Sequence, residues 1–70
     1  MTYIAIGVFG WGKGRTAQIA KRHLRENVSY DNRNKYVIYS CTDENATVNH
    51  MGAIIARTAP QEVERKNWPE

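Results

Sequence analysis

The amino-acid sequence predicts a single small α+β domain, with a strand, a helix and two further strands in that order. Three segments predict it: 3–9 and 36–41 are rich in β-branched and aromatic residues, and 17–28 between them has apolar residues at helical spacing. The chain has 70 residues, which is long enough for one domain, 1–70, and too short for two. We expect one amphipathic helix packed on a three-stranded mixed sheet, with room for a short C-terminal helix.

The first predicted strand, residues 3–9, has two apolar faces. Side chains alternate between the faces of a strand. One face holds Ile4, Ile6 and Val8, and the other holds Tyr3, Ala5, Gly7 and Phe9. Because neither face is polar, we expect an interior strand. The following segment, 10–14, contains three glycines, which disfavour extended pairing, so we expect a loop there.

The predicted helix, residues 17–28, has one apolar side and one basic side. The apolar stripe is Ala17, Ile19, Ala20, His23, Leu24 and Val28. The opposite arc holds Gln18, Lys21, Arg22 and Arg25. Thr16 directly precedes the helix, where its hydroxyl can accept a hydrogen bond from a first-turn amide, so we expect it to be the N-cap.

The second half of the chain carries weaker signals. Residues 36–41 predict a second strand, which a right-handed helical crossover would bring back parallel to the first. We expect a third strand near 53–58, antiparallel to the second. A capping-box pattern with an early proline at 58–61 favours a short helix over about 60–66. Because one helix covers only one face of such a sheet, the other face would be open to a partner or to a homodimer.

From these elements we predict one mutually buried core. Its members are Ile6, Val8, Ala20, Leu24, Val37 and either Ile38 or Tyr39. A domain of this size buries only about 60% of the surface that its unfolded chain exposes, so each core side chain matters for stability.

The glycine-rich segment partly matches two phosphate-binding patterns. Residues 7–13 read G-x-x-x-x-G-K, but Gly14 follows where Ser or Thr would hold Mg²⁺. Residues 12–17 read G-x-G-x-x-A, but the chain holds only half of a mononucleotide-binding unit. Two interpretations stay open: close packing of helix and strand, or an anion site formed by Gly12, Gly14 and Thr16. Both involve a tight turn, for which we predict a positive φ at Gly12 or Gly14.

Basic residues are concentrated in the first half of the chain. Residues 1–35 contain seven Lys or Arg and two acidic residues, whereas 36–70 contain three and five. Such a cationic segment favours an acidic protein surface or nucleic-acid phosphates, unless it is simply a solvated helix face. The predicted partner-binding residues are Trp11, Lys13, Arg15, Lys21, Arg22 and Arg25. We expect them to form one continuous surface, with Trp11 as an aromatic anchor.

The sequence favours no catalytic, metal or cofactor site. Cys41 could pair with His23 or His50 as nucleophile and base, but no third group can be assigned to orient them, so we expect no enzyme. A single cysteine excludes an internal disulfide and indicates a reducing, cytoplasmic setting. No apolar run reaches the roughly 18 residues of a membrane span, so we expect no membrane partner.

The strand followed by Trp11-Gly12-Lys13-Gly14, then Thr16 and a basic helix containing Ala20, then a Tyr-rich strand, resembles small uncharacterised open reading frames of phages and prophages. The likeness covers about residues 3–41 and brings no family functional residue with it. It implies an accessory protein that acts by binding, as inhibitors of bacterial defence such as anti-CRISPR proteins do.

We therefore expect a non-enzymatic interaction protein, a phage-type inhibitor that binds a host protein complex through its basic helix face. The alternative is a small nucleic-acid-binding protein that uses the same basic, Trp-containing face.

Overall fold

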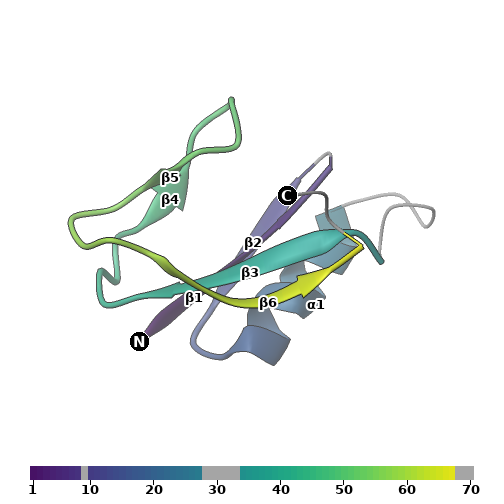
Figure 1. Ribbon diagram of the computed structural model, residues 1–70, viewed down its shortest axis with the longest axis horizontal. Helices are drawn as coiled ribbons and strands as arrows, with labels where there is room; N and C mark the ends of the chain where they lie inside the picture. The colour runs from purple at the N-terminus through teal and green to yellow at the C-terminus, as the bar shows by residue number, and fades with distance from the viewer. Residues whose placement is uncertain (9, 28–33, 68–70) are drawn as a thin grey trace.

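The computed structural model describes residues 1–8, 10–27 and 34–67, and it is an α+β domain built around a four-stranded antiparallel sheet (Figure 1). The elements are β1 (Thr2–Gly7), β2 (Trp11–Gly14), α1 (Ala17–Asn27), β3 (Tyr36–Cys41), β4 (Thr47–Val48), β5 (Ile54–Ile55) and β6 (Gln61–Lys66). The main sheet has the order β2-β1-β3-β6, and β4 and β5 form a separate two-stranded sheet. The α+β class is confirmed. Phe9 and Val28, which we placed in the first strand and the helix, lie outside the described residues.

The direction of the strands differs from our prediction. We expected a loop at 10–14 and a second strand parallel to the first. Instead, β2 occupies 11–14 and pairs antiparallel with β1, in a hairpin that the Gly7 amide helps to close by donating to the Gly10 carbonyl (2.8 Å). Because β2 has already reversed the chain, the helix crossover joins β2 to β3, which lie on either side of β1, and β3 runs antiparallel to β1.

The C-terminal segment is a strand and not the short helix we predicted. β6 pairs antiparallel with β3, and the register shifts between Ile38 and Tyr39. Without β6 the buried strand β3 would leave a row of backbone groups without partners, so tertiary pairing outweighs the local capping pattern. The third strand expected at 53–58 was also wrong in its pairing, because Ile54–Ile55 pairs with β4 and not with β3.

Two core clusters lie on opposite faces of the main sheet. The cluster on the helix side is Ala5, Ala20, Leu24, Tyr36 and Ile38. The cluster on the other side is Ile4, Ile6, Val37, Cys41 and Ala46. The alternation predicted for the first strand is therefore confirmed, whereas the single mutually buried core is not. Val8, which we placed in that core, is 45% exposed.

The face that we expected to be open is covered by residues 43–57, which we call the arm. The arm contains the β4–β5 hairpin, which stands apart from the main sheet in Figure 1. From it, Val48, Ile54 and Ala56 pack against the cluster around Ile4 and Ile6. The possible homodimer through this face stays a prediction.

Gly12 and Gly14 allow α1 to approach the sheet closely. A Cβ on Gly12 would lie 2.3 Å from the backbone nitrogen of Leu24, and one on Gly14 would lie 2.4 Å from Cγ2 of Ile19. Among the described glycines only Gly52 has a positive φ, so the positive φ predicted at position 12 or 14 was wrong. The close-packing interpretation is confirmed, with a strand in place of the expected turn.

Hydrogen bonds close the base of the arm and shape its tip. The Asp43 carboxylate accepts from the amides of Asn45 and Arg57 (both 2.9 Å), and the hydroxyls of Thr42 and Thr58 lie 3.0 Å apart. At the tip, Oδ1 of Asn49 accepts from the amides of Met51 (2.9 Å) and Ala53 (3.0 Å), and Gly52 adopts φ 83°. Hydrogen bonds therefore tie down both ends of the arm.

The base of the arm is expected to loosen in acid. The amides of Arg57 and Asn45 hold the pKa of Asp43 below its ordinary value. A carboxylate with a depressed folded pKa stabilises the fold above its unfolded pKa, and this contribution disappears as the pH falls through the folded pKa. We expect the amide proton shifts of Arg57 and Asn45 to titrate together with Asp43, at a midpoint below the ordinary aspartate value. In Asp43→Asn this titration should vanish; its persistence would assign it to another group.

Among the described residues, no helix combines the length and apolar character needed to cross a bilayer.

Candidate interaction surfaces

Arg22 and Arg25 lie on the outer side of α1, and a third exposed arginine, Arg15, lies just before the helix; we call these three residues the arginine stripe. Arg15 precedes the N-cap, and Arg22 and Arg25 are neighbours at helical spacing on the side opposite the buried Ala20 and Leu24. All three are exposed, and none forms an ion pair with any residue in the described part of the chain. Of the predicted partner-binding residues, Arg22 and Arg25 therefore share one accessible side of the helix, and Arg15 is exposed beside Lys13 and Gly14.

Lys21 is engaged within the chain. Its ammonium group lies 3.1 Å from the Glu64 carboxylate and 5.2 Å from the centroid of the Tyr36 ring. The Tyr36 hydroxyl donates to the same carboxylate. The neighbouring Tyr36 hydroxyl and Glu64 raise the pKa of Lys21, and Tyr36 and Lys21 lower the pKa of Glu64. This network fastens α1 to β3 and β6, so Lys21 contributes to the fold.

Trp11 and Lys13 lie on the opposite side of the sheet from the helix. Trp11 pairs with Ile6 and Lys13 with Ile4, and directly paired residues share a face. Trp11 packs against the cluster around Ile4 and Ile6, and Nζ of Lys13 donates to the carbonyl of Glu44 (2.7 Å). The single continuous surface that we predicted is therefore divided by the sheet, because residues 11–14 alternate as a strand.

The outer edge of β2 is occupied by side chains of α1. Nδ1 of His23 lies 2.7 Å from the Lys13 carbonyl oxygen, and Nδ2 of Asn27 donates to the Trp11 carbonyl (3.3 Å). These contacts protect an edge strand from pairing with another chain. They also explain why a histidine lies on the inner stripe of the helix.

The loop expected to bind an anion is not present in the predicted form. Gly12 and Gly14 belong to β2 and pair with Ala5 and Tyr3. The Thr16 hydroxyl accepts from the Ile19 amide (3.1 Å), which confirms the predicted N-cap. These three residues therefore form a strand and a helix cap, and the structural argument for an anion site is lost.

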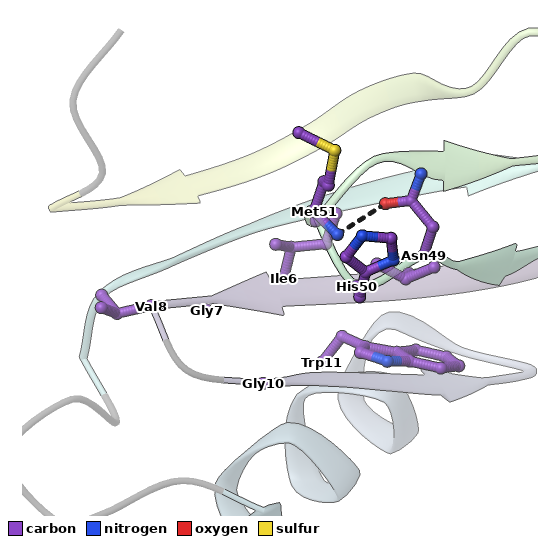
Figure 2. A pocket seen from close by; sticks show the side chains of 10 residues that line it. Ile6, Gly7, Val8, Gly10, Trp11, Asn49, His50 and Met51 are labelled. Carbon is purple, nitrogen blue, oxygen red and sulfur yellow. Dashed lines mark hydrogen bonds between the residues drawn. The ribbon is translucent and has the colours of Figure 1, made fainter.

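A cleft of about 530 Å³ opens between the main sheet and the tip of the arm. Figure 2 shows Trp11 of β2 on one side, and Asn49, His50 and Met51 of the arm on the other. The lining residues are Ile6, Gly7, Val8, Gly10, Trp11, Val48, Asn49, His50, Met51 and Gly52. Our sequence reasoning included only Trp11 of these in the candidate site. The missed signal was Asn49-His50-Met51-Gly52 between Val48 and Ile54, which is typical of a hairpin turn ending in glycine.

Cys41 and the two histidines serve different parts of the structure. Cys41 is buried, and its Sγ donates to the carbonyl of Asp43 (3.6 Å). His23 contacts β2, and His50 is exposed at the arm tip. Within residues 1–8, 10–27 and 34–67, no group of three or more His, Cys, Asp or Glu is placed to hold a metal ion.

No protein-family model, curated protein or solved structure matches the chain in comparisons with known proteins.

Proposed function

We propose that the protein acts without catalysis by binding a protein partner that presents an acidic surface to the arginine stripe. The observation that carries this proposal is the set of three exposed guanidinium groups, none of them in an ion pair with a described residue. The two lysines of the predicted partner-binding set are engaged internally: Lys13 by the Glu44 carbonyl and Lys21 by Glu64. The planar guanidinium fork suits bidentate contact with carboxylates.

An acidic protein suits this surface better than a nucleic acid does. Single-stranded nucleic acids are commonly bound by aromatic stacking beside phosphate contacts, and here Trp11 lies on the other side of the sheet. Nucleic-acid binding is therefore the second candidate, supported by the stripe alone.

The stripe is expected to orient the partner more than to hold it tightly. An exposed ion pair contributes about 0.2–1 kcal/mol, so three contribute about 0.6–3 kcal/mol. Charged rims mainly steer association and fix register. An inhibitor of a host defence complex in the cytoplasm is one protein of this kind. The phage-like pattern at 3–41 supports that role, and the single free cysteine supports that compartment.

Reversing two charges in the stripe should weaken this binding strongly and leave the fold intact. We expect Arg22→Glu with Arg25→Glu to weaken binding of a short Glu-rich peptide by about tenfold or more, because two attractions become repulsions. The peptide is compared with single-stranded and duplex oligonucleotides of equal charge, at about 50 and about 200 mM salt. Thermal unfolding of the double variant should match that of the wild type.

The matched control is Lys35→Glu with Arg57→Glu, which changes the net charge equally at two exposed cations outside the helix. It should keep most of the binding. An equal loss of peptide binding in both double variants would show that net charge alone explains the effect. Oligonucleotide binding tighter than peptide binding, with a steep salt dependence, would favour the nucleic-acid alternative.

A further inference from the structure

We propose that the cleft between Trp11 and the arm tip is a second binding site, which takes apolar side chains from an uncharged segment of a partner polypeptide. It lies on the face of the sheet opposite to α1, whereas Arg22 and Arg25 of the arginine stripe lie on the outer side of α1. The site is therefore separate from the surface of the proposed function, and the two can be tested independently.

Two apolar side chains in the lining of the cleft are exposed. Met51 at the arm tip is 81% exposed and Val8 at the end of β1 is 45% exposed, and both line the cleft. Trp11 packs on the core cluster and also lines the cleft. Tryptophan is enriched among the residues that dominate binding energy, and the flexible, polarisable methionine is common on surfaces that receive varied peptides. Large apolar side chains of a partner would cover this surface.

Charge complementarity defines the chemistry of the occupant. Among the described residues that line the cleft there is no Asp, Glu, Lys or Arg, although the chain as a whole carries a net charge of +3. A phosphate or carboxylate would find no countercharge there, and burying it would be costly. The occupant is therefore neutral where it enters the cleft.

The polar groups of the lining favour a peptide over a small molecule. Sites for small molecules usually present several convergent polar groups that fix the orientation of the ligand. In this cleft the side-chain oxygen of Asn49 is already used by the amides of Met51 and Ala53. His50 is the other polar side chain of the lining. A peptide that inserts apolar side chains needs few polar contacts from the cleft, because the peptide backbone can remain hydrated at the rim.

The arm holds the cleft open before a partner arrives. Asp43 and the Thr42–Thr58 pair close its base, and Asn49 with Gly52 shapes its tip. Val48 and Ile54 fasten the hairpin to the core cluster. A site that is already ordered loses less conformational entropy on binding, which favours affinity.

The test uses a displayed library of random peptides, with the wild-type protein as the target. We expect the selected peptides to be rich in large apolar residues and free of charge at the enriched positions. The peptide most enriched is then titrated into labelled protein, and it should shift the amides of Gly10, Trp11 and residues 48–52. Met51→Ser should weaken its binding by about tenfold, because it removes an exposed apolar contact without touching the core.

The matched control is Ile55→Ser, which also removes an exposed apolar side chain (53%) from the same hairpin but from outside the cleft. It should leave binding unchanged, as should the Arg22→Glu, Arg25→Glu double variant. Enrichment of acidic or basic peptides, equal losses in the Met51 and Ile55 variants, or no enrichment at all would overturn the proposal. A dimer that dissociates on Met51→Ser would overturn it in favour of a second copy of the chain. If the peptide experiment fails, the proposal for the arginine stripe still stands, and if the stripe experiment fails, the proposal for this cleft still stands.

Discussion

Replacing Gly12 by alanine is expected to destroy most of the stability of the domain. A Cβ at this position would lie 2.3 Å from the backbone nitrogen of Leu24 and 2.5 Å from the carbonyl oxygen of Ala20. These are backbone atoms of α1, so no change of rotamer can relieve the clash and the helix would have to leave the sheet. Overpacking of a core costs about 1–3 kcal/mol even where side chains can adjust, and we expect a larger loss here. Thermal or urea unfolding of Gly12→Ala measures it.

Gly52→Ala is the matched control for this substitution. Gly52 has nothing within 4 Å of its expected Cβ, but its φ of +83° is unfavourable for alanine. We expect a cost of about 1–2 kcal/mol from backbone strain alone. If Gly12→Ala cost no more than Gly52→Ala, the close contact between α1 and β2 would be wrong.

Truncating Leu24 should have the second largest effect on stability. Leu24 is fully buried on the helix side of the sheet, where it packs with Ala5, Tyr36 and Ile38. Large-to-small substitutions of this kind cost about 2–5 kcal/mol, because they lose the transfer free energy of the side chain and leave a cavity. That is a large fraction of the stability of a small domain. We therefore expect Leu24→Ala to lower the melting temperature strongly.

The exposed Val63 of β6 provides the comparison, since it is 51% exposed and its truncation to alanine should change stability little. A melting temperature for Leu24→Ala close to that of Val63→Ala would show that the helix face is assigned wrongly.

Local patterns in the sequence predicted the elements that are stabilised by their own periodicity. Alternation along β1 and the apolar stripe of α1 both correspond to the structure, as does the N-cap at Thr16. The C-terminal strand could not be predicted in this way, because its conformation depends on pairing with the distant β3. The strands β4 and β5 contain two residues each, which is too short for any periodicity to appear.

The sequence predicted only part of the candidate site, again because local periodicity does not show which distant residues come together. Arg22 and Arg25 belong to a helix whose faces could be assigned, so their exposure on one side followed from the sequence. Trp11 and Lys13 were assigned to a loop, and pairing with β1 turned both toward the opposite face. Lys21 was expected to be free, but its partners Glu64 and Tyr36 are distant in sequence. The arm tip with Met51 entered the site only through the three-dimensional structure.

The most direct test of the central claim, that an acidic protein surface binds along α1, is an amide chemical-shift map of the labelled protein with the Glu-rich peptide. The arginine stripe predicts shifts that cluster at Arg15, Arg22 and Arg25, with residues 48–52 unchanged, because the sheet separates the two surfaces. Shifts centred on the arm tip or on β6, with the amides of the helix unmoved, would contradict it.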